Sequence, residues 1–485
     1  MVGIAGILIA LGLLMYLAFR GVTVLVLGPL MAALAVLIAG GLPILGSYTQ
    51  IFMTSAGQFI IAFFPLFMLG AIFGKLMDDS GSAQSIARSV IAWLGASRAI
   101  LAVVLCCAVL TYGGVSLFVV AFAVFPIAAS LFRQGDIPKR LIPATLALGA
   151  FTFTMSALPG TPAIQNAIPM PFFGTTAFAA PGLGIIAGLI MLVLGTAWLD
   201  RQAARARRAG EGYGEHADAM PVPDVPTRDR AAPADPFDLA EVEPGHETAA
   251  ELPSFPLAIA PVVLVVLVNF AFIELVVPRL DTAYLAEPLF GATTIEAVRG
   301  LWAIIVALIC SIVFLAAVNW TRLRSLKVSV NRGADAAVVP IFNTASLVGF
   351  GAVVAALPAF ELVREAVLSI GAGNPLISLA VAVNVLAAMT GSASGGMSIA
   401  LESLGPTYVE LARQAGISLE VMHRVTAVAA GTLDSLPHNG AVITLLTICQ
   451  LGHKDAYGNI FVVAIVVPIL ALISLIALAT VFGSF

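Results

Sequence analysis

Apolar residues follow one another along most of this chain in runs that are long enough to cross a lipid bilayer. A membrane-spanning helix needs about 17–25 predominantly apolar residues in succession. Uninterrupted runs of this length cover residues 2–19, 22–40, 55–77, 180–199, 255–278, 297–318, 334–358 and 457–482. Each of these runs predicts a helix that spans the membrane.

Further apolar stretches are broken near their middle. They cover residues 98–132, 139–172, 375–412 and 419–451. A Gly-rich break inside an apolar run predicts non-helical backbone at membrane depth, which is tolerated only where it is buried in protein or lines a wet cavity. We interpret 98–132 and 375–412 as re-entrant hairpins, and 139–172 and 419–451 as broken spans. The hairpin breaks read Tyr112-Gly113-Gly114 and Thr390-Gly391-Ser392-Ala393-Ser394-Gly395-Gly396.

The middle of the chain, residues 200–254, is different in kind. It combines many prolines with acidic residues and alanines, and it has no helical apolar period. Such a segment cannot bury enough apolar surface to offset the entropy of ordering the chain. We therefore expect a disordered, acidic, Pro-rich linker between two halves, residues 1–199 and 255–485.

The two halves resemble each other in sequence. RQGDI at 133–137 matches RQAGI at 413–417, and SALPGTPAI at 156–164 matches DSLPHNGAV at 434–442, in the same order and at nearly equal spacing. These matches predict an internal repeat. The expected fold is an all-α polytopic membrane protein of about ten spans plus two hairpins. Each repeat has three spans, a re-entrant hairpin, a broken span and a final span.

The positions of Lys and Arg predict how the chain is oriented across the membrane. Five crossings in each repeat is an odd number, so the second repeat is expected to be inverted relative to the first. Cytoplasmic segments are enriched in Lys and Arg. A cytoplasmic linker leaves few cations outside, namely Arg279, Arg299, Arg364, Arg413 and Arg424. We expect a multi-pass protein of the bacterial plasma membrane with both termini outside.

Composition narrows the class of protein. Apolar residues make up 60% of the chain and charged residues only 10%, the mean hydropathy is +1.04, and the net charge is −4. Lipid must therefore be the solvent for most of the chain, and no basic face exists to bind nucleic acid. The four cysteines lie in apolar stretches and are expected to be small buried hydrophobes. The sequence predicts no metal site and no cofactor.

Inverted repeats with paired discontinuous elements are typical of secondary transporters. A broken helix presents unpaired N–H groups to an anion and unpaired carbonyl groups to a cation. Because the apolar stretches contain almost no Lys or Arg, we expect helix ends, hydroxyls and amides to hold an anionic substrate. The candidate substrate-binding residues are Tyr112, Gly113, Gly114, Ser116, Thr161, Gln165, Asn166, Thr390, Ser392, Ser394, Gly395, Ser435 and Asn439.

Asp434 is the candidate for coupling transport to an ion. It lies in the middle of an apolar run, where a carboxylate is costly, and its repeat mate is Ser156, so the fold does not require an acid there. His438 follows it at the break. Together they would bind and release a proton, or the carboxylate would coordinate Na⁺; Glu402 is a weaker candidate.

These residues resemble the gluconate permease (GntP) family within the wider ion transporter superfamily. The segments that carry the resemblance are TYGGVSLFVVAFAVFPIA (111–128), FTFTMSALPGTPAIQN (151–166), AAMTGSASGGMSIALESLG (387–405) and GTLDSLPHNGAVITLL (431–446). The resemblance implies a homodimer with a static scaffold and a moving transport domain, which imports hydroxy-carboxylates with H⁺. Within this family, the segment DSLPHNGAVIT (434–444) looks more like members that carry short hydroxy acids such as 3-hydroxybutyrate than like the gluconate carriers.

Other functions are weighed against this one. The alternative carrier is a Na⁺-coupled symporter of di- or tricarboxylates such as citrate, although the breaks depart from the Ser-Asn-Thr motifs of that branch. An ion channel is the alternative from another class. GSASG at 391–395 has Ala393 where a hydrolase needs its nucleophile, and the chain has no P-loop. We therefore expect no enzymatic activity.

Overall fold

A computed structural model describes residues 2–20, 22–115, 117–214, 252–323, 325–371, 373–437 and 439–485. It confirms an all-α fold, with no strand among these residues. The helices of the first half are α1 (Val2–Phe19), α2 (Val24–Ala39), α3 (Ile44–Gly46), α4 (Met53–Asp79), α5 (Ser82–Leu94), α6 (Ala99–Tyr112), α7 (Leu117–Gln134), α8 (Ile142–Ala150), α9 (Phe153–Ser156), α10 (Ile164–Ala167), α11 (Pro169–Phe173) and α12 (Pro181–Arg208).

The second half repeats this order of elements. Its helices are α14 (Phe255–Ala271), α15 (Ile295–Val318), α16 (Leu326–Ala336), α17 (Val338–Ala356), α18 (Phe360–Ser369), α19 (Pro375–Thr390), α20 (Ala393–Gln414), α21 (Leu419–Ala430), α22 (Gly440–Ile448), α23 (His453–Phe461) and α24 (Val467–Phe482). Short π-helical or 3₁₀ stretches join some neighbours into longer rods. In the described part, six helices, single or joined in this way, are long and apolar enough to cross a membrane, and shorter apolar helices accompany them.

Each half contains one helix that the sequence patterns did not predict. α5 and α18 lie between the third span and the hairpin of their halves. Both are too short to span a bilayer, and both mix charged with apolar residues, so neither forms an uninterrupted apolar run. The length of apolar runs therefore does not predict α5 and α18.

The final span of the first half also continues beyond its predicted end. α12 runs through Arg208, so the first residues of the segment interpreted as a linker are helical. The chain then folds back on the α7–α8 connection, where Arg140 donates hydrogen bonds of 2.6 and 2.9 Å to Glu211. These bonds hold the pKa of the Glu211 carboxyl below its usual range. Asp136 accepts a hydrogen bond from the backbone N–H of the buried Tyr213 at 3.0 Å. Residues 215–251, the rest of the expected linker apart from 252–254, lie outside the described residues.

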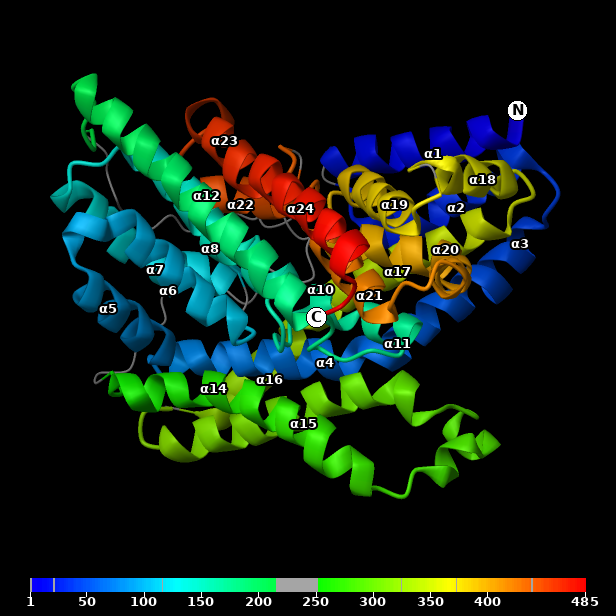
Figure 1. Cartoon of the computed structure of the whole chain (residues 1–485), viewed down its shortest axis with the longest axis horizontal. Helices are drawn as coiled ribbons and strands as arrows, with labels where there is room; N and C mark the ends of the chain where they lie inside the picture. The colour runs from blue at the N-terminus through cyan, green and yellow to red at the C-terminus, as the bar shows by residue number, and fades with distance from the viewer. Residues whose placement is uncertain are drawn as a thin grey trace.

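The helices pack in two groups. In one, α4 contacts α15, α16 and α17, while α2 contacts α1 and α17. In the other, α12 lies beside α24 and also packs on α8, and α21 contacts both α24 and α19. Figure 1 shows α12 and α24 running side by side across the molecule, while α14, α15 and α16 lie along its opposite edge near α4. The last span of each half therefore packs on the broken spans rather than on the first three spans.

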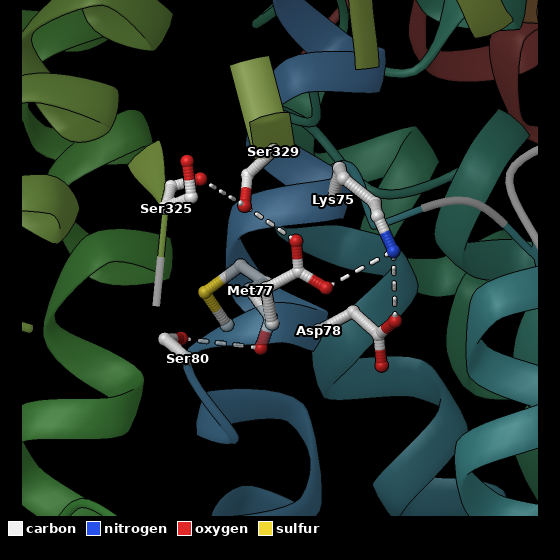
Figure 2. A network of polar contacts seen from close by, with 7 residues as sticks. Lys75, Met77, Asp78, Ser80, Ser325 and Ser329 are labelled. Carbon is white, nitrogen blue, oxygen red and sulfur yellow. Dashed lines mark hydrogen bonds and ion pairs between the residues drawn. The ribbon is translucent and has the colours of Figure 1, made fainter. Parts of the chain in front are cut away.

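A polar network at the end of α4 joins the third spans of the two halves. Lys75 is buried and pairs with Asp79 at 3.0 Å and with Asp78 at 3.6 Å. Ser329 of α16 donates a hydrogen bond of 2.6 Å to the other oxygen of Asp79. Figure 2 shows Ser329 and Lys75 joined by dashed lines to the same carboxylate. Both ion pairs lie within α4, and the hydrogen bond from Ser329 joins them to α16.

Candidate functional site

The tip of the first hairpin is hydrogen-bonded to the break of the first broken span. α6 ends at Tyr112, whose hydroxyl donates a hydrogen bond of 2.6 Å to the carbonyl of Pro159. Gly114 has a φ of +92°, and a Cβ atom there would lie 2.9 Å from Cγ of Pro162. The tip therefore requires glycine, both for its backbone conformation and for its close approach to the break.

The tip of the second hairpin makes the equivalent contact with its own broken span. Asn439 donates a hydrogen bond of 2.8 Å from its side-chain nitrogen to the carbonyl of Gly391. Its side-chain oxygen caps α22 by accepting from the N–H groups of Ala441 and Val442. Ser392 caps α20 by accepting from Gly395 at 3.1 Å. In both halves one side chain thus fastens a hairpin tip to a break.

The structure brings both tips and both breaks into one region. α20 packs on α10 and α11, and α22 packs on α7. The two breaks also approach each other, since a Cβ atom on Gly431 would lie 3.4 Å from the hydroxyl of Ser156. Ser116 and His438, two of the predicted site residues, lie outside the described residues.

Most of the predicted polar side chains are engaged within the protein. Thr390 donates to the carbonyl of Leu386 at 2.8 Å, and Thr161 accepts from the N–H of Ala163 at 3.3 Å. Ser394 is fully buried, and its hydroxyl lies 3.3 Å from that of Ser392. Gln165 is buried as well, and its side-chain oxygen accepts no hydrogen bond from any residue that the structure describes.

A small cavity adjoins the first tip. Its volume is about 30 Å³, which is room for about one water molecule. Gly114 and Thr111 of the hairpin line it together with Ile164 of the broken span and Leu308 of α15. Among the described residues, the hydroxyl of Thr111 has no hydrogen-bond partner. Thr111 and Gln165, at the first tip and break, thus each present a buried polar atom that no described residue pairs.

Arg424 is the site residue that the sequence interpretation missed. The sequence interpretation counted it only among the few cations on the outer side of the membrane, whereas its side chain is fully buried in α21. All five N–H donors of its guanidinium group are used by acceptors in the first half. These acceptors are the carbonyls of Ser156 (3.2 Å), Ala177 (3.4 Å) and Ala179 (3.0 and 2.7 Å) and the side-chain oxygen of Asn166 (3.0 Å).

The neighbouring His423 completes the same network. Its Nε2 lies 3.2 Å from the side-chain oxygen of Asn166, and its Nδ1 lies 2.6 Å from the hydroxyl of Thr175. Asn166 donates its two amide hydrogens to the carbonyls of Thr161 and Ala177, both at 3.0 Å. A neutral ring with its proton on Nε2 satisfies every one of these groups. The network therefore fixes the first break firmly to α21.

The structure buries cations to which the sequence interpretation gave no role. That interpretation expected helix ends, hydroxyls and amides to hold an anionic substrate, because the apolar stretches contain almost no Lys or Arg. Lys75 and Lys139 are buried as well as Arg424. Arg424 differs from the other two because it lies at a helix break, beside the candidate binding region. Its signal in the sequence was a guanidinium inside an otherwise apolar run, the predicted broken span 419–451.

The second break is held more loosely around Asp434. This side chain is partly exposed, and it accepts a hydrogen bond of 3.2 Å from the hydroxyl of Ser435. From α23, Tyr457 donates to the carbonyl of Ser435 at 3.2 Å, and His453 lies 2.9 Å from the carbonyl of Pro437. A carboxylate offers about four lone-pair sites, so it keeps acceptor capacity for a proton or a cation beside this bond.

These features define a polytopic α-helical membrane protein in which paired helix breaks face paired hairpin tips. The sequence is 42% identical to the uncharacterized transporter YxjC of Bacillus subtilis (strain 168) over 466 residues, which are 95% of this chain and 95% of the relative. The chain belongs to the family of that protein. No protein-family model matches the sequence.

Proposed function

We propose that this protein is a secondary active transporter that imports a small hydroxy-monocarboxylate together with H⁺. The observation that carries the proposal is the paired arrangement of tip and break in each half. Discontinuous helices that meet between two repeats are the usual site of substrate and ion binding in transporters. The name of the related protein agrees with the general class, transport, and the resemblance to gluconate permeases supports the substrate class.

The charges at the breaks favour an anionic substrate. Arg424 places a buried positive charge beside the first break. The N-terminal ends of α20 and α22 lie at the second tip and the second break, and helix N-termini attract anions. A carboxylate bound here would meet positive potential from both halves, while the tip residues and Gln165 would offer hydrogen bonds to its hydroxyl groups.

Asp434 is the proposed coupling residue. Its side chain is partly exposed, which allows it to exchange a proton, and His438 follows it in the sequence. Proton binding would remove the negative charge that repels a carboxylate substrate. The alternative of Na⁺ coupling with a di- or tricarboxylate substrate uses the same residue, because a carboxylate and nearby carbonyls are ligands for a cation. An ion channel would also exploit helix breaks.

We further propose an elevator motion of one group of helices against the other. The moving unit would contain the hairpins and broken spans, and also α12 and α24, because these two pack on the broken spans. The helices around α4 would form the static scaffold and, by resemblance, the homodimer contact. The linker would be cytoplasmic and both termini would be outside.

Uptake by purified protein in liposomes tests the function. We expect saturable uptake of radiolabelled gluconate or 3-hydroxybutyrate, driven by a pH gradient, acid outside, and unaffected by Na⁺. Protein-free liposomes and the Gly114→Val protein are the controls. Uptake that requires Na⁺ and is competed by citrate would favour the alternative carrier, and flux that rises with concentration without saturating would favour a channel.

A further inference from the structure

An apolar cavity of about 220 Å³ lies between α1, α17, α18, α19 and α20. Each of these helices contributes apolar side chains to its walls, namely Leu11, Phe350, Val367, Ala382 and Leu404. An engineered apolar cavity of about 150 Å³ stays dry and binds benzene, which shows what such a space can hold. The cavity beside α19 is therefore large enough for a hydrocarbon ligand, and its walls offer little to an ordered water molecule.

The cavity opens toward the side of the molecule. Leu8 of α1 and Val385 of α19 line it and are themselves exposed. Neither α1 nor α19 contains a charged residue, so this opening faces the hydrocarbon of the bilayer rather than water. Atoms that line an empty space lose the dispersion contacts that they would make with a neighbour. A lipid tail that enters the cavity restores these contacts.

Arg364 of α18 brings a positive charge to this apolar cavity. α18 is too short to span a bilayer, and it exposes Glu361 and Glu365, as a helix that lies at the membrane surface does. Arg364 donates from Nη2 to Glu361, whereas its Nε is buried and donates to no residue that the structure describes. A guanidinium N–H group is a strong donor to phosphate oxygen.

The shape and polarity of the cavity distinguish its ligand from the substrate of the proposed transport. A hydroxy-carboxylate needs a hydrogen-bond partner for several oxygen atoms, because a buried polar group without one is costly. Apart from Arg364, the polar side chain that lines the cavity is that of Ser403. A phospholipid fits both features, since its acyl chain matches the apolar walls and its phosphate matches the free N–H group of Arg364.

We propose that this cavity binds one acyl chain of a membrane phospholipid, whose phosphate accepts a hydrogen bond from Nε of Arg364. The chain enters from the bilayer between Leu8 and Val385. The site lies between α1 and α17 on one side and the two arms of the second hairpin, α19 and α20, on the other. A bound lipid therefore separates this hairpin from helices of the other group, and its binding does not depend on which substrate the protein carries.

Photolabelling of the full-length protein in liposomes of phosphatidylethanolamine and phosphatidylglycerol tests the site. The probe is a phosphatidylglycerol that carries a diazirine on one acyl chain, and mass spectrometry identifies the labelled residues. We expect labelling of Leu404, which lines the cavity although only 3% of its surface is exposed. Leu401 is the matched control, because it is buried on the same helix and does not line the cavity. Val263, exposed on α14, reports contact with bulk lipid.

The pattern of labelling decides the proposal. Label on Leu404 and Val263 but not on Leu401 supports a lipid in the cavity. Label on Val263 alone would overturn the proposal, because the cavity would then be empty or covered by a second copy of the chain. A fatty acid with the same diazirine should label Leu404 more weakly than the phospholipid does. Equal labelling by the two probes would overturn the role given to the phosphate.

Two substitutions test the walls and the charge separately. Ala382→Phe places a ring in the cavity, so the label on Leu404 should be lost while labelling by bulk lipid is unchanged. Arg364→Leu should weaken the label from the phospholipid and leave that from the fatty acid unchanged. Glu365→Gln is the control, since Glu365 is exposed on α18 and does not line the cavity. Unchanged labelling of Leu404 in both folded variants would contradict the site. If a variant fails to fold, the contrast between the two leucines of α20 in the unaltered protein still decides.

Discussion

The two helix breaks have related sequences but different surroundings. In the first break, Asn166 and several backbone carbonyls are held by Arg424 and His423 from the other half. In the second break, Asp434 accepts a hydrogen bond from the hydroxyl of the neighbouring Ser435, and its side chain is partly exposed. In the register that pairs Ser156 with Asp434, Leu146 pairs with Arg424, so neither charge has a counterpart in the repeat.

The difference shows how a duplicated architecture supports two roles. A fully satisfied buried network gives rigidity, because every group in it would lose a partner if the backbone moved. A carboxylate with spare acceptor capacity can change its protonation state without breaking its neighbours apart. We interpret the first break as the fixed part of the proposed site and the second as the part that exchanges a proton.

The largest effect is expected when Arg424, which holds the first break through its hydrogen bonds, is replaced. Arg424→Leu removes the guanidinium donors to the carbonyls of Ser156 and Ala179, while Ala177 and Asn166 each keep another donor. A buried acceptor left unpaired costs about 1–3 kcal/mol. We expect a large loss of thermal stability and of folded yield, measured by size-exclusion chromatography after heating. Arg413→Leu is the matched control, because Arg413 is exposed at the end of α20. Equal stability of both variants would contradict the claim that Arg424 stabilises the first break.

Substitutions at the hairpin tips are expected to have the next largest effect, and this effect is on the uptake of substrate rather than on stability. Gly114→Val places a β-branched residue at a φ of +92° and against Pro162, and Gly395→Val places one against Leu347. Each should abolish uptake while the protein still inserts into the membrane. Gly57→Val is the control, since a Cβ atom there meets nothing within 4 Å. Normal uptake by both tip variants would reduce the breaks to packing features.

Asp434→Asn tests whether the second break exchanges a proton, because asparagine permanently mimics the protonated side chain. We expect the variant to bind substrate and to exchange labelled for unlabelled substrate, but to lose accumulation driven by a pH gradient. Counterflow and gradient-driven uptake in liposomes measure the two properties separately. Glu402→Gln is the comparison, as a partly buried acid on a neighbouring helix. If Asp434→Asn still accumulates substrate under a pH difference, coupling belongs to another residue, and His438 is next.

The smallest effect is expected from single hydroxyl groups at the two breaks. Tyr112→Phe removes the bond to Pro159 (2.6 Å) at the first break, and Tyr457→Phe removes the bond to Ser435 (3.2 Å) at the second. A hydrogen bond of this kind contributes about 0.5–1.5 kcal/mol. We expect Tyr112→Phe to lower thermal stability more than Tyr457→Phe, because its bond is shorter and belongs to the more rigid break. The reverse order would contradict the contrast.

The sequence by itself determined the class of fold and the place of the breaks. Run length alone predicts spans, because a bilayer of fixed thickness demands a minimum apolar length, and this predicted the ranges of α1, α2 and α15 closely. Gly113-Gly114 and Gly391 marked both hairpin tips, since a positive φ and a close approach require glycine. These are local properties of the chain, and local properties can be read along it.

Only the tertiary structure decided the role of Arg424. Its acceptors lie 245 to 268 residues earlier in the chain, and no spacing rule connects positions so far apart. The count of Lys and Arg treated it only as one of the few cations on the outer side. A lone guanidinium is costly inside a membrane, and packing of α21 against the first break offsets that cost by offering an acceptor to every donor. Arg424 therefore lies buried beside the proposed site, which its position in the sequence did not reveal.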